Sequence, residues 1–302
     1  MKTISILMNC FNGEKYLKEA IDSVFNQTYK NWEIIFIDNC SSDKSADIAN
    51  SYGLKLKYFK TPKNIPFGEA RAFGVERCNG DYLMYLDVDD RYHNNTVEIL
   101  INEIINTNYL VVYSGHININ ENGKKIGTHE TRPKSGIIFS DLLKQYDVPT
   151  ASLIMDMNKY KKLGHIYDSE MEVSAEYNHF LKLSVKNQFK CIEGTVIDYR
   201  IHSNGLTLKR GASAFKDRVK TLNDIILEYP ETLKTHAEEY KEAFARADYY
   251  LARKFINDND LTAARKILRK HVFLSLNYFA VYLTLFMPNY LRTKIFKLKY
   301  KR

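Results

Sequence analysis

Residues 82–90 read Tyr82-Leu83-Met84-Tyr85-Leu86-Asp87-Val88-Asp89-Asp90, an apolar run that ends abruptly in three carboxylates. The apolar part predicts a buried β-strand over residues 82–86. Like charges so close together are costly without a cation. Carboxylates at a strand end suit Mg²⁺ or Mn²⁺ shared with substrate phosphates, because these ions keep several waters and use few protein ligands. The alternative is a solvated turn whose aspartates cap the next helix.

Similar strands recur on both sides of this stretch and alternate with helical patterns. Strands are expected over 3–8, 32–37, 55–59, 82–86, 109–113, 151–156 and 190–198, and helices over 14–26, 43–52, 69–78, 94–106 and 174–186. This alternation predicts an α/β fold with a mostly parallel sheet flanked by helices. Such sheets bind ligands at the carboxyl ends of their strands. The irregular, glycine-rich stretch 115–150 is typical of loops or a hairpin beside the site.

Composition sets the broad class of the protein. The chain has 302 residues, 45% of them hydrophobic, which is enough for one large domain with an appendage. Four scattered cysteines without a CxxC spacing argue against a zinc site or a disulfide framework, so a reducing cytoplasm is the expected location. The N-terminal run up to Asn9 is too short for a signal peptide and is expected to be the first strand.

The motifs around these strands resemble the family-2 glycosyltransferases of the GT-A fold. The matching segments are Ile4 to Asn12, Glu14 to Tyr29, Ile34 to Asp43, Glu69 to Gly74 and Gly80 to Asp90. The resemblance covers residues 1 to about 205 and keeps the order and spacing of the family's motifs. It implies a Rossmann-like catalytic domain that binds a nucleoside diphosphate sugar, with a DxD motif at Asp87-Val88-Asp89.

The resemblance also assigns roles to individual residues. Asn9, Asp38 and Arg71 are expected to line the base pocket, where carboxylate, amide and guanidinium groups can pair with a pyrimidine. Asp87 is expected at the ribose or the metal, and Asp89 and His202 at the metal, while Asp90 supports the turn. The remaining residues expected to bind the nucleotide sugar are Phe11, Asn39, Val88 and Arg200. Asn39 departs from the family's usual aspartate, which leaves the identity of the base open.

Glu176 is the expected catalytic base. The segment Ser174 to Leu183 resembles the family's helix that opens with a Glu-Asp pair, and the trailing Leu-Lys-Leu aligns Glu176 with that aspartate. Ala175 then replaces the glutamate, so the motif is altered. Glu170 and Glu172 are rivals for the role. Alternatively, Glu176 is only a first-turn residue favoured by the helix dipole.

The resemblance implies a metal-dependent, inverting hexosyltransferase. A divalent cation, Mn²⁺ or Mg²⁺, would neutralise the charge that develops on the leaving diphosphate. The donor is expected to be a UDP-sugar, and the acceptor a hydroxyl of a surface polysaccharide, lipopolysaccharide or lipid-linked glycan. A sugar-phosphate nucleotidyltransferase remains as a rival, although the glycine-rich basic loop of that class is missing. A degenerate domain that serves as an assembly or binding module is the non-enzymatic alternative.

Two other classes fit poorly. No GxGxxG follows the first strand, which argues against a nicotinamide-linked oxidoreductase. The net charge of +8 is concentrated at the C-terminal end and not in a stripe along the sheet domain, so nucleic acid is not an expected partner.

The C-terminal part of the sequence has helical patterns and no further strand signals. Residues 1–213 are expected to form the catalytic domain and residues 214–302 a helical region, with a helix, a turn at 257–260 and a second helix between 243 and 271. The apolar stretch 272–287 is short for a membrane-spanning helix. Together with Lys294, Lys297, Lys299, Lys301 and Arg302, it resembles an interfacial anchor for anionic lipids on the cytoplasmic face of the inner membrane. The alternative is a helix packed on the catalytic domain.

Overall fold

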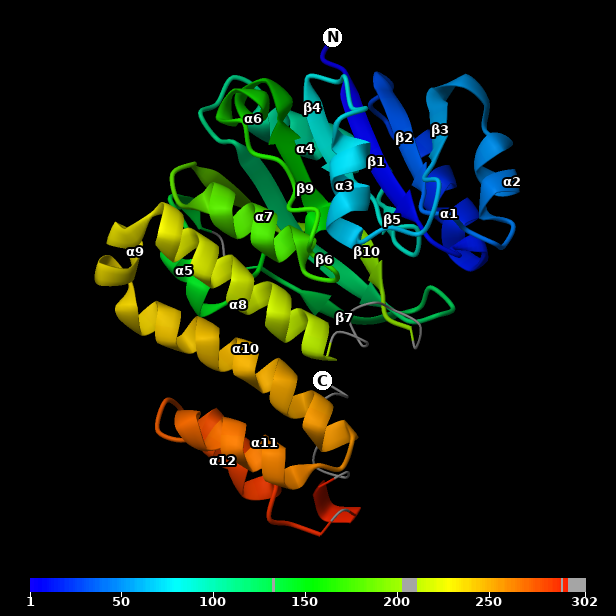
Figure 1. The fold of residues 1–302 in the computed structure, drawn as a ribbon. Coiled ribbons are helices and arrows are strands. Elements are labelled where there is room, and N and C mark those ends of the chain that lie inside the picture. The colour runs from blue at the N-terminus through cyan, green and yellow to red at the C-terminus, as the bar shows by residue number, and fades with distance from the viewer. Residues whose placement is uncertain (132–133, 203–210, 289, 293–302) are drawn as a thin grey trace. The chain divides into compact units, whose positions relative to one another are not determined.

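The computed structural model of the chain describes residues 1–131, 134–202, 211–288 and 290–292. Within these ranges the chain divides into two compact units, Met1–Leu208 and Lys209–Arg302 (Figure 1). The basic residues expected at the extreme C-terminus, from Lys294 to Arg302, lie outside the described residues.

The N-terminal unit is built from alternating strands and helices. Its strands are β1 (Ile4–Cys10), β2 (Trp32–Asp38), β3 (Leu56–Lys60), β4 (Tyr82–Tyr85), β5 (Arg91–Tyr92), β6 (Val111–Ile119), β7 (Lys125–His129), β8 (Ser135–Gly136), β9 (Leu153–Asp156) and β10 (Phe189–Arg200). Its α-helices are α1 (Glu14–Phe25), α2 (Ser45–Asn50), α3 (Phe67–Val75), α4 (Thr96–Ile104), α5 (Phe139–Lys144), α6 (Met157–Leu163) and α7 (Ala175–Ser184). Each strand and helix expected from the sequence is present, with shifted ends.

The strands form one sheet in the order β3-β2-β1-β4-β9-β6-β10-β5, and β7 and β8 pair with β6 and β10. The pairs β3-β2, β2-β1, β1-β4 and β6-β10 are parallel, whereas β9 is antiparallel to both β4 and β6. All the longer central strands except β9 therefore run in one direction. The sheet is mixed in its pairing, and the polar carboxyl ends of β1, β2 and β4 lie side by side.

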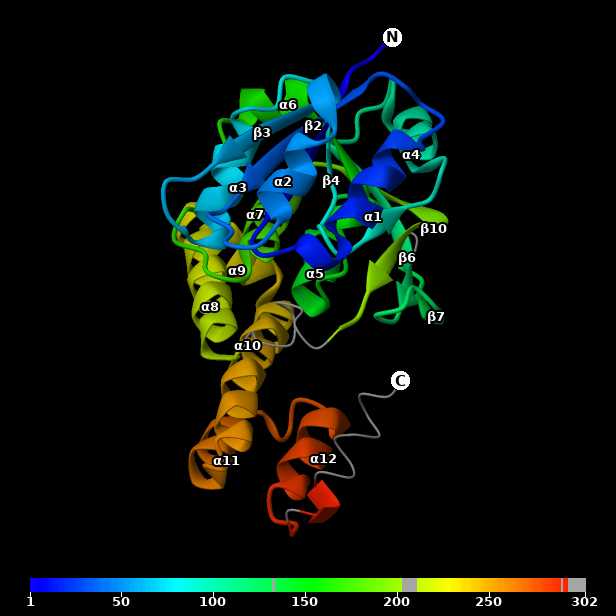
Figure 2. The same ribbon diagram turned by 90° about the vertical axis from the view of Figure 1, so that its right-hand side faces the viewer.

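Helices cover both faces of this sheet (Figure 2). Alternate residues of β1, including Ile4, Ile6 and Met8, pack in one core with buried side chains of α1 and α4. The intervening residue Leu7 faces α3, where a side chain at Gly74 would meet Leu7 Cδ1 at 2.4 Å. Strands buried on both faces explain the nearly continuous apolar runs in the sequence.

The stretch 115–150, which is expected to form loops or a hairpin, contains a hairpin. The expected strand 109–113 continues through Gly115 to Ile119 as β6 and pairs with β7. A Cβ at Gly115 would lie 2.3 Å from the carbonyl oxygen of His129, so glycine is needed for the close approach of the two strands. The short helices α5 and α6 were not expected. Helix α6 follows β9 directly, and the carboxylate of Asp156 caps it by accepting from Lys159 N at 3.0 Å.

The C-terminal unit is helical in its described residues. It contains α8 (Gly211–Glu228), α9 (Pro230–Thr235), α10 (Ala237–Asn257), α11 (Leu261–Leu268) and α12 (Leu276–Thr284). The expected turn between two helices is confirmed, because α10 ends at Asn257 and the Asp260 side chain caps α11 by accepting from Ala263 N. A small core forms where α10, α11 and α12 meet, with Ala252, Ala264, Leu268, Val281 and Leu285 buried.

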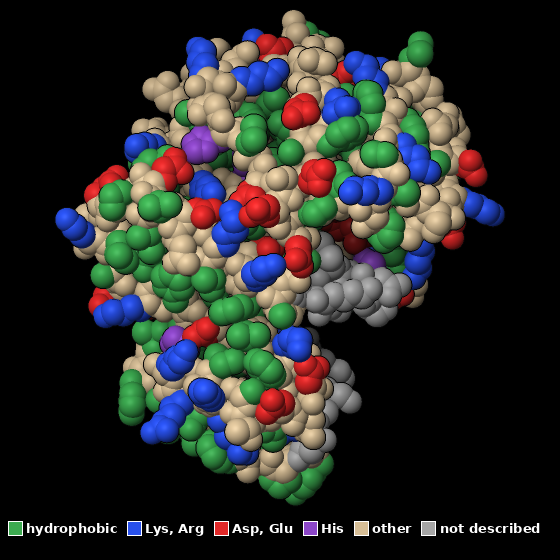
Figure 3. Space-filling model, viewed as in Figure 1, with side chains coloured by type: hydrophobic (Ala, Val, Ile, Leu, Met, Phe, Trp, Pro, Cys, Tyr) green, Lys and Arg blue, Asp and Glu red, His purple; other side chains and the backbone are tan. Residues whose placement is uncertain are grey.

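The surface of the N-terminal unit carries charges of both signs. On the face that Figure 3 shows, Lys and Arg side chains are interspersed with Asp and Glu side chains.

Helix α3 is held against the segment before α7 by an unusually close backbone contact. Gly68 N donates to Met171 O at 2.9 Å, and a Cβ at Gly68 would lie 2.0 Å from the carbonyl oxygen of Asp168. This contact needs a residue without a side chain, because a backbone atom cannot move aside as a flexible side chain can. It fixes the start of α3 and, four residues later, the position of Arg71.

We expect Gly68→Ala to destabilise the protein by about 2 kcal/mol, the typical cost of overpacking a well-packed site. Helix propensity alone predicts the opposite sign, since alanine is favoured over glycine in a helix by about 1 kcal/mol. Urea unfolding followed by circular dichroism measures the difference. Gly127→Ala is the matched control, because its nearest atom would be 3.7 Å away. If Gly68→Ala and wild type were equally stable, the close backbone contact would not require glycine.

Candidate active site

The residues expected to bind a nucleotide sugar come from three neighbouring strand ends. Asn9 is the penultimate residue of β1, Asp38 ends β2, and Asp87 follows β4 by two residues. Cys10 and Asp38 are register partners in the parallel pair β1-β2, and Asn39 N donates to Cys10 O at 2.7 Å. The sheet therefore brings these three polar ends together at one edge.

Arg71 of α3 is the centre of this arrangement. Its side chain is fully buried and donates to Asn9 Oδ1 at 2.9 Å, to Asp87 Oδ1 at 2.8 Å and to Glu176 Oε1 at 2.9 Å. Although burial disfavours its charge, the carboxylates of Glu176 and Asp87 raise the pKa of Arg71 above its usual value. One guanidinium thus joins the end of β1, the turn after β4 and the start of α7.

Two aromatic rings enclose the guanidinium. Phe67, one helical turn before Arg71 in α3, lies with its ring centroid 4.8 Å from the guanidinium carbon, and Tyr85 of β4 lies at 5.1 Å. Cation–π contacts of this kind are worth more when the cation is withdrawn from water. They restrict the rotamer of Arg71 and so the geometry of the two carboxylates that it binds.

Glu176 lies in the first turn of α7, and its side chain is 14% exposed. Tyr146 donates from its hydroxyl to the carbonyl oxygen of Glu176 at 3.1 Å, which helps to fix this turn. Further along α7, His179 is buried and stacks on the Tyr167 ring at 3.8 Å between centroids. The structure therefore places the expected base on a well-held helix and connects it through Arg71 to Asp87.

Asp89 and His202, the two expected metal ligands, contact each other, with 2.8 Å between Asp89 Oδ2 and His202 Nε2. Burial and the neighbouring charge of Asp87 raise the pKa of Asp89, and the hydrogen bond from His202 opposes this. Asp90 is buried, and burial and the charges of Asp89 and Asp87 raise its pKa well above its usual value. A divalent cation would relieve this crowding of carboxylates, so the residues fit one.

Within the described residues, no group of three or more His, Cys, Asp or Glu side chains has a geometry that could hold a metal ion. Asp89 and His202 supply two protein groups. A site that takes its other ligands from water and a diphosphate is the arrangement that Mg²⁺ and Mn²⁺ use with phosphorylated substrates.

Arg200, which is expected to bind the nucleotide sugar, is held by contacts within the protein. Its side chain is 2% exposed and pairs with Glu19. It also donates from Nε to the carbonyl oxygen of Asp89 at 2.8 Å, and its backbone N–H donates to Asp90 Oδ1 at 2.8 Å. In this position Arg200 supports the acidic turn that carries Asp89 and Asp90.

Asn39 also has a supporting position. Its amide donates to Ile65 O at 2.9 Å, and its carbonyl accepts from Ile65 N at 3.0 Å and from the Thr61 hydroxyl at 3.1 Å. These contacts fasten the loop between β3 and α3. The amide that replaces the family's aspartate is thus used for loop structure, because a carboxylate could not donate to the Ile65 carbonyl.

Asp38 is fully buried, and its two carboxylate oxygens accept from Ser41 N at 2.7 Å and from the Tyr58 hydroxyl at 2.6 Å. Phe11, by contrast, is 55% exposed at the end of β1. Val88 lies against Gly13, where a Cβ would be 2.8 Å from Val88 Cγ2. Among the residues expected to bind the nucleotide sugar, Phe11 has an aromatic ring that is exposed to solvent.

Three supporting residues were not anticipated from the sequence: Tyr58, Glu19 and Phe67. Glu19 of α1 pairs with both Arg91 and Arg200, so it joins three elements beneath the acidic turn. Phe67 and Arg71 are four residues apart and share a face of α3, but the predicted helix began at residue 69 and left Phe67 outside it. Tyr58 and Glu19 act across the fold and leave no local pattern.

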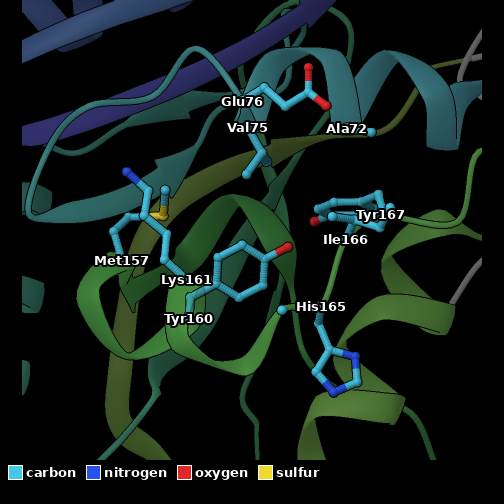
Figure 4. Close-up of a pocket in the computed structure, with 10 residues that line it drawn as sticks. Ala72, Val75, Glu76, Met157, Tyr160, Lys161, His165, Ile166 and Tyr167 are labelled. Atoms are coloured by element: carbon cyan, nitrogen blue, oxygen red, sulfur yellow. The ribbon is translucent and has the colours of Figure 1, made fainter.

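A separate hollow of about 210 Å³ lies between α3, α6 and residues 164–167 (Figure 4). It is lined mainly by apolar groups, with Glu76, Lys161 and His165 among them. None of the residues expected to bind donor or metal lines it. It borders the buried Tyr167 and is not the site assembled at the strand ends.

Comparison with known proteins places this geometry in a family. Residues 5–165 match the family described as Glycosyl transferase family 2. An uncharacterized glycosyltransferase of Rickettsia typhi is 30% identical over 206 residues, which cover 66% of this chain and 64% of that relative. The chain spans between 27% and 64% of the length of this and the other Rickettsia relatives. The putative teichuronic acid biosynthesis glycosyltransferase TuaG of Bacillus subtilis is 22% identical over 218 residues, 70% of this chain and 84% of TuaG.

Solved structures show the same fold. Staphylococcus aureus TarS residues 1–349, in complex with UDP-GlcNAc, matches with a TM-score of 0.67 and 15% identity over 90% of this chain and 81% of that one. The mannosyltransferase PcManGT of Pyrobaculum calidifontis, in complex with GDP-Man and Mn²⁺, matches with a TM-score of 0.61 and 12% identity over 94% of this chain and 79% of that one. The N-terminal unit therefore has the expected GT-A fold.

The buried His179 generates a prediction about stability and pH. Burial, with smaller effects from His165 and Lys182, lowers the pKa of His179 to about 3. The unfolded chain binds a proton on this residue near pH 6.5, whereas the folded protein does not until the pH approaches 3. Stability from this residue is therefore lost as the pH falls below 6.5. We expect His179→Phe to reduce that loss by up to about 1.4 kcal/mol per pH unit.

Urea unfolding at pH 7, 6 and 5 measures this slope for wild type, His179→Phe and the control His236→Gln. His179→Phe also removes the hydrogen bond of His179 with the backbone of Ile166. This loss shifts the free energy of unfolding by a similar amount at every pH, so the slope isolates the titration. If wild type and His179→Phe lost the same stability between pH 7 and pH 5, His179 would not be the source of the pH dependence.

Proposed function

Because the chain belongs to glycosyl transferase family 2, we propose that it transfers a hexosyl group from a nucleoside diphosphate sugar to an acceptor hydroxyl with inversion of configuration. The observation that carries this proposal is the buried Arg71, which joins Asp87 at the expected donor site to Glu176, the expected base. A solvated acidic turn or a first-turn helix glutamate would need no such connection.

We assign residues 1–213 to the catalytic domain, and we expect Phe11 and Val88 to contact the donor. Asp38, in the strand end next to Asn9, borders the same place. Asn39 and Arg200 hold the surrounding loops and act on the donor only through them. The donors in the solved relatives, UDP-GlcNAc for TarS and GDP-Man for PcManGT, support a nucleotide sugar, and we favour a UDP-sugar here.

The reaction that we propose is a single displacement. Glu176 accepts the proton of the acceptor hydroxyl while the acceptor oxygen bonds to the anomeric carbon. The bond from that carbon to the diphosphate oxygen breaks, and the nucleoside diphosphate leaves with the electron pair. Arg71 fixes the orientation of the Glu176 carboxylate, because its Nε and Nη2 atoms donate to Glu176 Oε1 at 3.1 and 2.9 Å. A divalent cation, Mn²⁺ or Mg²⁺, held by Asp89 and His202 would neutralise the charge of the leaving diphosphate.

We propose a lipid-linked or surface-polysaccharide intermediate as the acceptor, acted on at the cytoplasmic face of a membrane. The name of TuaG, a putative teichuronic acid biosynthesis glycosyltransferase, supports a cell-surface glycan.

The transferase activity can be measured as nucleotide release from a panel of UDP-, GDP-, CDP- and dTDP-sugars with Mn²⁺ or Mg²⁺. We expect Asp89→Ala to lower the rate by at least about 100-fold, because a ligand of the charge-neutralising cation is lost. We expect Glu176→Gln to lower transfer to acceptor by about 100- to 10,000-fold, since an amide cannot accept the proton. Glu170→Gln and Glu172→Gln are the controls. Loss of transfer in either of these, with Glu176→Gln active, would move the base to that residue.

Substitution of Arg71 can distinguish a positioning role from direct contact with the nucleotide base. We expect Arg71→Lys to lower kcat by about 10- to 100-fold, because an ammonium cannot bridge Asn9, Asp87 and Glu176 together. The nucleotide affinity, measured by calorimetry, should change by less than about threefold. A variant that loses nucleotide affinity and keeps kcat would restore the base-contact role. Arg71→Met should instead lose about 3 kcal/mol of stability, since it leaves the Glu176 carboxylate, which is only 14% exposed, without its charged partner.

A further inference from the structure

The positive charge of the protein resides in its last 42 residues. Residues 261–302 contain ten of the 44 Lys and Arg residues and none of the 36 Asp and Glu residues. Residues 1–260 therefore carry 34 basic and 36 acidic residues, close to neutrality. Within the described part of this segment, Lys266, Arg269 and Lys270 are exposed at the end of α11 and just after it. A segment without any acidic residue presents one sign of charge to its surroundings.

The same segment contains most of the exposed large apolar side chains among the described residues of its unit. Of the 18 large hydrophobic side chains that are exposed among the described residues, eight lie between Phe273 and Leu291. Phe273 is 98% exposed and Leu276 86% exposed. Hydrophobic and basic side chains are both visible on the face of the C-terminal unit in Figure 3. Apolar side chains gathered in this way mark an interaction surface, whereas isolated ones need no explanation.

Helix α12 has two apolar faces. Val281 and Leu285 are buried in the core with α11, and Arg265 of α11 donates to the carbonyl oxygen of Leu285 at 2.6 Å. Leu276, Phe279 and Leu283, spaced by three and four residues, form a second stripe and are 86%, 44% and 45% exposed. The inner face accounts for the attachment of α12. The outer stripe has no role in the core of this unit.

We propose that residues 261–288 form a docking surface for a lipid bilayer that contains anionic phospholipids. The exposed stripe of α12, with Phe273, would enter the interface between headgroups and acyl chains, and Lys266, Arg269 and Lys270 would meet the lipid phosphates. No described helix is long and apolar enough to cross a membrane. The nine residues of α12 extend only about 14 Å, against an apolar bilayer thickness of about 30 Å. The surface therefore lies on the bilayer.

Charge favours this occupant over a second copy of the chain. Two copies meeting through this face would bring together segments that contain only basic charges, which repel. An anionic membrane supplies both the complementary charge and the apolar phase. This inference does not depend on the glycosyl transfer proposed above, because binding to vesicles needs neither donor nor acceptor.

The test is co-sedimentation of the full chain with vesicles of phosphatidylcholine alone or with about 30% phosphatidylglycerol. We expect binding to the anionic vesicles, weakened when the salt is raised from about 0.1 M to about 0.5 M. Phe273→Ser with Leu276→Ser should weaken binding at least about tenfold, and Lys266→Glu, Arg269→Glu and Lys270→Glu by about fivefold or more each. Both serine changes are at exposed positions, so folding should be retained. Leu54→Ser with Leu227→Ser, 99% and 85% exposed in wild type, is the matched control.

Three outcomes would overturn the proposal. The first is no binding to anionic vesicles, and the second is binding that Phe273→Ser with Leu276→Ser leaves unchanged. The third is a dimer in analytical ultracentrifugation that those substitutions convert to a monomer, with no binding to vesicles, which would make a second copy the occupant. Asp89→Ala should bind vesicles as wild type does, so a failure of the catalytic proposal would leave this result unaffected.

Discussion

The ion pairs of Arg71 are the interaction on which the arrangement of the candidate site depends. Removing a guanidinium from water is costly, and two carboxylates and a side-chain amide compensate this cost only if they converge on it. Asn9, Asp87 and Glu176 are 62, 16 and 105 residues away from Arg71 in the chain. Their convergence therefore requires the strand order, the path of α3 and the start of α7 to be correct together.

The backbone contact at Gly68 and the acidic turn after β4 can be understood from this requirement. Gly68 lets α3 approach the segment before α7 closely enough for Arg71 to reach Glu176. On the other side, Arg200 and Glu19 hold the turn that carries Asp89 and Asp90. One buried arginine thus aligns the carboxylates of the site, and a second one supports the turn. Such fixed supporting contacts are what preorganised catalytic groups need.

Much of the fold was accessible from the sequence, because the apolar runs and their polar ends are local signals. The strands from β1 to β4, the polar ends that meet at one edge, and the helix of Glu176 all follow from such patterns. The reversed strand β9 and the path of β6 through Gly115 did not, since they depend on contacts between distant segments. The same reason explains why the contacts of Asn39 and Arg200 within the protein could not be predicted. A motif gives the type of a residue, but which way its side chain points is decided by partners such as Ile65 and Glu19.

The acidic and the net basic parts of the chain lie in different stretches of its sequence. A site for a diphosphate needs positive charge, yet the N-terminal part collects carboxylates at its strand ends, which is reasonable only if a cation accompanies the substrate. The near-neutral balance of residues 1–260 fits the cation that we propose, because that cation would bring the positive charge for the phosphates. The fixed positive charge of the chain is then available for a different anionic surface.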